Sequence, residues 1–112
     1  MPHFLVRFSY TPETWAKLID EPEDRRAAVA AAVEQIGGRL HGFWYAFGEY
    51  DGYCVIEAPD NVSHASVAVA AIGSGTLARS EAVVLLTEEE MTEALSRARG
   101  LQFEPPGRSG PE

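Results

Sequence analysis

The sequence predicts an α+β fold of the ferredoxin-like type, in which four antiparallel strands carry two helices on one face. An alternating strand-like run over residues 3–10 comes first and leads into helical segments. An aromatic run over 39–57 then has the composition of two adjacent strands. A further helix and strand follow. The resulting order is β-α-β-β-α-β, with one short helix after it.

Length, charge and cysteine content limit the class of protein. The chain has 112 residues, of which 46% are hydrophobic and 23% charged, as expected for one globular domain. A net charge of -8 repels phosphate, so we expect neither nucleic acid nor a membrane as partner. The single cysteine cannot form an internal disulfide, which favours a cytoplasmic location.

The first helices are predicted from their start and stop signals. Thr11 is positioned to cap a short helix that has Pro12 in its first turn. Asp20 is the predicted cap of the main helix, which runs on to Ile36 and ends at Gly37-Gly38.

The central run 39–57 reads as two strands joined by a tight turn at Gly48-Glu49-Tyr50-Asp51-Gly52. Strict alternation along the first of these strands predicts two faces. One carries His41, Phe43, Tyr45 and Phe47, and the other carries Leu40, Gly42, Trp44 and Ala46.

The second half of the sequence contains the same kinds of helix start and stop signals. Asp60 is the predicted cap of a helix over 62–72, with Ala65, Ala68, Val69 and Ile72 as its buried stripe. A strand over 76–86 follows. Thr87-Glu88-Glu89-Glu90 then begins a last helix, which Gly100 ends. We therefore expect a domain over 1–103 and a disordered tail over 104–112, which is rich in proline and glycine.

One face of the predicted sheet has no helix to cover it. Phe4, Val6, Phe8, Cys54, Ile56 and Ala58 form the helix-facing layer. The opposite side carries Leu5, Tyr53 and Val55 together with Arg7 and Glu57. An exposed apolar face usually marks an interface, so we expect a homodimer through this side of the sheet. The alternative is a monomer whose last helix folds over it.

Around Gly48-Glu49-Tyr50-Asp51 the sequence resembles the GYD domain family, small bacterial proteins of largely uncharacterised function. Further points of resemblance are Tyr10-Thr11, Gly37-Gly38, Glu57-Ala58-Pro59-Asp60 and the Leu86-to-Glu90 start of the last helix. The resemblance implies a ferredoxin-like fold of the dimeric α+β barrel type. Two departures are Gly52-Tyr53-Cys54 after the motif, and Ser80 and Ala82 in the last strand.

A ligand pocket is predicted between the hairpin and the helices, because the helix over 62–72 has mostly small side chains. We expect Trp44 or Tyr45 to bound the pocket, and Tyr50 and Asp51 to lie at its opening. Asp51 has an alternative role as a turn residue that accepts backbone N–H groups.

Candidate catalytic groups are few. His41 and Asp51 are the two candidates, and each also has a structural interpretation. His3 and His64 have no ligand-like spacing to His41, so no metal site and no cofactor are expected. Cys54 lies in an apolar strand and is assigned to the core.

These features predict a protein that binds a small molecule in an aromatic-lined pocket. Two alternatives remain open. One is a cofactor-independent enzyme of the monooxygenase, isomerase or cyclase type, and the other is a purely structural or interaction dimer.

Overall fold

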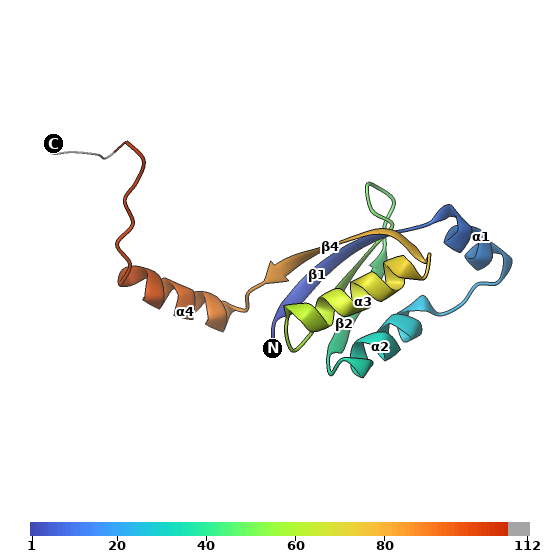
Figure 1. Ribbon diagram of the computed structural model, residues 1–112, viewed down its shortest axis with the longest axis horizontal. Helices are drawn as coiled ribbons and strands as arrows, with labels where there is room; N and C mark the ends of the chain where they lie inside the picture. Colours follow the sequence, from blue (N-terminus) through green and yellow to red (C-terminus); the bar gives the residue numbers. More distant parts are fainter. Residues whose placement is uncertain (108–112) are drawn as a thin grey trace.

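The computed structural model describes residues 1–107; residues 108–112, the end of the predicted tail, lie outside the described part (Figure 1). The elements are β1 (His3–Tyr10), α1 (Pro12–Asp20), α2 (Arg25–Gln35), β2 (Arg39–Tyr45), β3 (Gly52–Glu57), α3 (Asn61–Gly73), β4 (Leu77–Leu85) and α4 (Glu88–Arg99). The strands form one sheet in the order β2-β3-β1-β4, and every neighbouring pair is antiparallel. Helices α2 and α3 lie on the same side of this sheet (Figure 1). The predicted ferredoxin-like α+β fold is confirmed.

The core lies between the sheet and these two helices. Phe4, Val6 and Phe8 of β1 are buried on the helix-facing side, as alternation along the strand predicts. Cys54 and Ile56 of β3 join them. From the helix side, Val33 of α2 is fully buried. The predicted helix-facing layer is therefore confirmed.

Side-chain caps begin the helices, with one correction. Thr11, Asp60 and Thr87 accept backbone N–H groups at the starts of α1, α3 and α4, as predicted. The cap of α2 is Asp24 and not the predicted Asp20. Asp20 is instead the last residue of α1, because the first helix runs further than expected.

The inward stripe of α3 differs by about one position from the prediction. His64 is the buried residue of α3, and Val67, Ala68 and Ala71 continue its face over a cavity. Val69 and Ile72 are exposed. Alanine and valine occupy most of this helix, so the apolar pattern alone did not distinguish between neighbouring faces.

The connection between β2 and β3 is a loop over 46–51 and not the predicted tight turn. Gly48 has no positive φ, so the loop does not use it as a left-handed turn residue. Strand β2 also contains an irregularity: Leu40 pairs with Ile56 while Gly42 pairs with Val55, so His41 is the extra residue of a β-bulge. The bulge interrupts the alternation that predicted which side chains share a face.

Helix α4 extends away from the domain (Figure 1). It begins with the predicted capping box and ends at Gly100, and none of its residues is buried. Met91, Leu95, Leu101 and Phe103 are exposed on it or just after it. Within the described part of the chain, no helix is long and apolar enough to cross a membrane. The alternative in which the last helix covers the open side of the sheet is not what the protomer shows.

Candidate functional site

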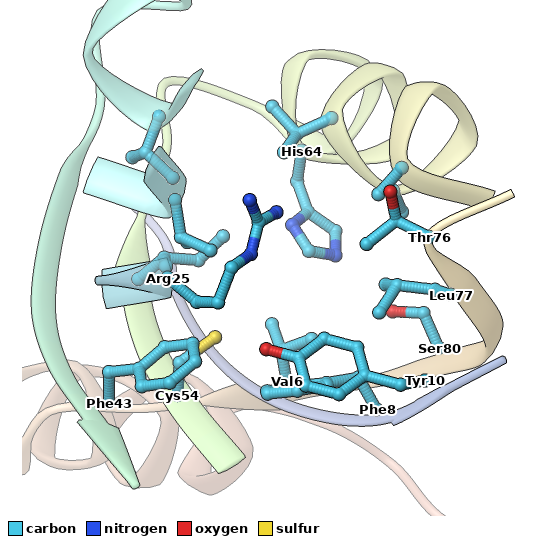
Figure 2. A pocket seen from close by; sticks show the side chains of 16 residues that line it. Val6, Phe8, Tyr10, Arg25, Phe43, Cys54, His64, Thr76, Leu77 and Ser80 are labelled. Carbon is cyan, nitrogen blue, oxygen red and sulfur yellow. The ribbon is translucent and has the colours of Figure 1, made fainter. Parts of the chain in front are cut away.

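A cavity of about 90 Å³ lies between the sheet and helices α2 and α3 (Figure 2). Its floor is made by sheet side chains, including Phe8, Phe43 and Cys54, and its roof by α2 and α3. The surface is almost entirely apolar. Its lining comprises Val6, Phe8, Tyr10, Arg25, Val29, Val33, Phe43, Cys54, Ile56, His64, Val67, Ala68, Ala71, Thr76, Leu77 and Ser80.

Three large polar side chains converge on this apolar space. Figure 2 shows Arg25 from the start of α2, His64 from α3 and Tyr10 from β1 around the same cavity. His64 stacks on Phe4, with ring centroids 4.5 Å apart, which fixes the imidazole plane. The Nδ1 atom of His64 and the Nε atom of Arg25 are buried without a hydrogen-bond partner among the described residues. Such atoms call for a ligand or an ordered water.

Burial sets the protonation of two of these groups. It lowers the pKa of His64, so the imidazole is neutral at pH 7. Burial also raises the pKa of Tyr10, and its hydrogen bond to Tyr45 adds to this effect. The two hydroxyl oxygens are 3.0 Å apart. At neutral pH the cavity therefore contains a fixed positive charge, on Arg25, together with the neutral imidazole of His64 and the neutral hydroxyl of Tyr10.

Small side chains on α3 keep the cavity open. Ala68 and Ala71 of α3 line the cavity where larger residues would fill it. Ser80, another small residue, lines it from β4. Outside the cavity, a groove of about 440 Å³ runs between α2 and α3. Arg25, Val29, Val67, Ala71 and Thr76 line both spaces. The groove is thus the natural approach to the cavity, and Arg25 lies along it.

The predicted pocket residues lie elsewhere. Trp44 pairs with Tyr53 on the side of the sheet away from the helices, and its ring occupies the space above Gly42, where a Cβ atom would meet it. Tyr45 reaches the cavity only through its hydrogen bond to Tyr10. Tyr45 and Asp51 instead line a shallow outer groove with Trp15.

Asp51 fastens the loop over 46–51 to the rest of the domain. Its Oδ2 atom accepts hydrogen bonds from the backbone N–H of Tyr10 at 2.9 Å and from Nε1 of Trp15 at 3.1 Å. Its backbone N–H donates to Phe8, and its carbonyl accepts from Ala46. This carboxylate therefore joins β1, α1 and the loop, which agrees with the structural alternative for Asp51.

Tyr50 is buried on the side of the sheet opposite to the cavity. Its hydroxyl donates to Glu81 of β4, and this hydrogen bond lowers the pKa of Glu81. The guanidinium groups of Arg7 and Arg79 lie 4.9 and 4.2 Å from its ring centroid. Tyr50 is thus surrounded by protein groups and is not placed at the mouth of a pocket.

His41 and Tyr45 do not share a face, contrary to the prediction from alternation. The bulge turns His41 to the side of the sheet away from the helices, where its Nε2 lies 2.8 Å from Glu57 Oε1. Tyr45 lies on the helix side, since it contacts Tyr10. His3 of β1 approaches the same carboxylate, with its Nε2 at 3.8 Å. Three strands therefore bring His3, His41 and Glu57 together, although they are far apart in the sequence.

The polar groups of the cavity had little signal in the sequence. His64 sits in a helix whose stripe was predicted one position away, and Arg25 lies in the first turn of α2, where the expected cap was misplaced. Tyr10 was the most predictable, because it continues the alternation of Phe4, Val6 and Phe8.

The fold and the cavity define the class of protein: a small ferredoxin-like α+β domain with an apolar cavity between its sheet and its helices. The model of the GYD domain family matches residues 4–95. The chain therefore belongs to the GYD domain family, as the Gly48-to-Asp51 motif indicated. A search of curated proteins finds no match to the chain.

Proposed function

We propose that this protein binds a small, mainly apolar molecule in the cavity between the sheet and helices α2 and α3. The observation that carries the proposal is the pair of buried, unpartnered nitrogen atoms, Arg25 Nε and His64 Nδ1, beside an otherwise apolar space within the described residues. Apolar walls with a few converging polar groups are the usual form of a small-molecule site.

The polar groups define the chemistry of the ligand. Arg25 is a fixed cation that lines both the cavity and the groove leading to it, so it favours an anionic group near the entrance. Its Nη1 already contacts Glu23 at 2.9 Å, but Glu23 is exposed and free to yield. The apolar part of the ligand then faces Phe8, Phe43 and Cys54. A small aromatic or branched carboxylic acid has both features.

The size of the cavity limits the ligand. An engineered protein cavity of about 150 Å³ accepts benzene or xenon, and the cavity here is smaller, at about 90 Å³. A small aromatic acid such as benzoate would therefore place only part of its ring in the cavity, and the rest, with its charged end, in the groove between α2 and α3.

The test uses xenon and benzoate as probes. Xenon reports on the cavity alone, and benzoate reports on the cavity together with Arg25. We expect the NMR signals of cavity methyl groups to shift with both probes in the natural protein. Ala68→Leu should abolish both responses by filling the space, while Ala65→Leu, on the exposed side of the same helix, should leave them unchanged.

Arg25→Met separates the two parts of the proposal. It should retain the response to xenon and lose the response to benzoate. If neither probe shifts a cavity signal in the natural protein, or if Ala68→Leu binds both normally, the proposed site is wrong.

A catalytic function is favoured by one observation, the neutral His64 imidazole inside the cavity. A neutral imidazole next to a bound molecule is suited to accept a proton from it. The molecule that copurifies with the protein, identified by native mass spectrometry, is the substrate to test. Conversion by the natural protein and not by His64→Gln supports an enzyme. Recovery of the molecule unchanged contradicts it.

We also propose that the protein acts as a homodimer through the open face, the side of the sheet that carries Leu5, Tyr53, Val55 and Val83. No helix of the described residues covers this face in the protomer (Figure 1). Its charged residues already have partners within the chain: Arg7 lies 2.6 Å from Glu81, and Glu57 contacts His41. Burying the face therefore leaves no isolated charge among these residues, which is the usual obstacle to such an interface.

A further inference from the structure

A second cluster of chemically active side chains lies on the open face, across the sheet from the cavity. It comprises His3 of β1, His41 of β2 and Glu57 of β3. One ligand-type atom from each of these residues lies within 4.8 Å of the other two. The cluster does not share any lining residue with the cavity, so a ligand bound here is independent of the proposed cavity ligand, although it lies on the face of the proposed homodimer.

The backbone builds this cluster in a specific way. His3 and Glu57 are direct partners in the antiparallel register of β1 and β3, so their side chains project from the same face. His41 reaches that face because it is the extra residue of the bulge in β2. Bulges re-aim side chains, and here the bulge adds a second imidazole to a His–Glu pair.

The two imidazoles and the carboxylate form a donor set that suits a transition metal. Histidine nitrogen and glutamate oxygen together bind zinc and related divalent ions, whereas calcium and magnesium prefer oxygen alone. With metal–ligand bonds of about 2.0–2.1 Å, ligand atoms around a tetrahedral ion are about 3.3 Å apart. The Nε2 atoms of His41 and His3 lie 2.8 and 3.8 Å from Glu57 Oε1. These two distances bracket the required separation, and all three ligand atoms lie within 4.8 Å of one another, so an ion fits with shifts of up to about 1.5 Å.

His3 has a ring nitrogen, Nε2, that is available to an ion. Its Nδ1 atom is buried without a hydrogen-bond partner within residues 1–107. Its Nε2 is too far from Glu57 for a hydrogen bond. An ion bound at Nε2 therefore displaces no hydrogen bond to Glu57, while Nδ1 can carry the proton of the neutral ring.

Solvent access completes the site. In the protomer, the side chains of His3, His41 and Glu57 are 27%, 36% and 20% exposed, so an ion can enter and a water molecule can take a fourth position. We propose that His3, His41 and Glu57 bind one divalent transition-metal ion per chain on the open face, with zinc as the reference ion.

Isothermal titration of the untagged full chain with zinc tests the proposal, and cobalt adds an optical readout. We expect one ion per chain and the visible absorption of cobalt bound by nitrogen and oxygen ligands. His3→Gln, His41→Gln and Glu57→Gln should each weaken zinc binding at least about tenfold, the smallest loss usual even for groups that only support a metal ligand.

Glu34→Gln is the matched control, because it makes the same chemical change on an exposed position of α2, on the helix side of the sheet. It should bind zinc like the natural protein. Circular dichroism and thermal melting confirm that each variant is folded. Absence of zinc binding at tens of micromolar, or binding that all three variants retain, would overturn the proposal.

Discussion

At the scale of single residues, Asp51 shows how the GYD motif contributes to the fold. Its carboxylate accepts hydrogen bonds from Tyr10 and Trp15 and so holds the 46–51 loop against β1 and α1. A tight turn would be held by hydrogen bonds within its own backbone. In this longer loop, the side chain of the motif aspartate makes the stabilising hydrogen bonds instead.

Asp51→Ala should lower the free energy of unfolding by about 1–3 kcal/mol, since it leaves the Tyr10 N–H without its acceptor. Asp51→Asn keeps one acceptor oxygen and should cost less. Chemical denaturation measures both, with Asp20→Ala, an exposed position at the end of α1, as the control. Binding of benzoate in the cavity should not change. A loss of binding with an unchanged free energy of unfolding would make Asp51 a ligand-binding residue after all.

His64 gives the protein a defined dependence on pH. Its pKa is lowered by burial, so the unfolded chain binds a proton at higher pH than the folded protein does. The stability contributed by the neutral imidazole is complete above the unfolded pKa, about 6.5, and is lost as pH falls toward the folded value. Arg25 and Tyr10, which line the same cavity as His64, do not titrate in this range.

We therefore expect the free energy of unfolding to fall between pH 7.5 and 5, by at most about 1.4 kcal/mol per pH unit for one proton. The carboxylates with lowered pKa values, such as Asp60 and Glu81, change the free energy of unfolding only at lower pH, where they become protonated. His64→Gln should flatten the profile between pH 7.5 and 5 and leave the acid limb in place. An equally steep profile in that variant would contradict a buried neutral His64.

At the scale of elements, the sequence predicted what depends on local signals and failed where contacts between elements decide. Strand β1 and the caps Thr11, Asp60 and Thr87 follow from alternation and from side-chain chemistry within a few residues. The bulge in β2 depends on how β2 pairs with β3, and no local pattern marked it. That single extra residue put His41 on the face opposite to Tyr45 and Leu40 on the face opposite to Trp44, whereas the prediction had placed each pair on one face.

The same distinction explains the cavity. Small residues on α3 correctly indicated an unfilled space between helix and sheet. Its location depends on the rotation of α3, which the sequence placed about one residue away, and therefore His64 was not identified.

Helix α4 depends on its own capping, because no residue of it is buried. Thr87→Ala removes the acceptor for the Glu90 N–H and should cost the helix about 1 kcal/mol. Amide hydrogen exchange should become faster in residues 88–99 and stay unchanged in β1 and α3. Equal acceleration throughout the protein would show that α4 and the domain unfold as one unit. Thr92→Ala, within the same helix, is the control.

At the scale of the whole molecule, the protomer leaves two apolar surfaces without cover from the described residues, the open face and the exposed side of α4. Val83 on the open face and Met91 and Leu95 on α4 are all exposed. In the proposed homodimer, two-fold pairing would bring the open faces of two copies together and cover the first of these surfaces.

Val55→Glu should convert the dimer to a monomer at micromolar concentration, because it introduces a charge into the centre of the proposed interface. The variant should remain folded, as Val55 is only half-buried in the protomer. Sedimentation velocity measures the change. Val69→Glu makes the same substitution on the exposed side of α3 and should remain dimeric. A natural protein that sediments as a monomer contradicts the interface.

The single cysteine has a consequence for kinetics. Cys54 is buried in the cavity wall, and its burial raises the pKa of the thiol to about 11, so at pH 8 roughly one thiol in a thousand is in the reactive form. A thiol reagent must reach Cys54 through the cavity, and the groove between α2 and α3 is the same approach that a ligand would use. The rate at which a reagent modifies Cys54 in the native protein therefore measures how readily small molecules enter the cavity. No label needs to be introduced, since the sequence contains no other cysteine.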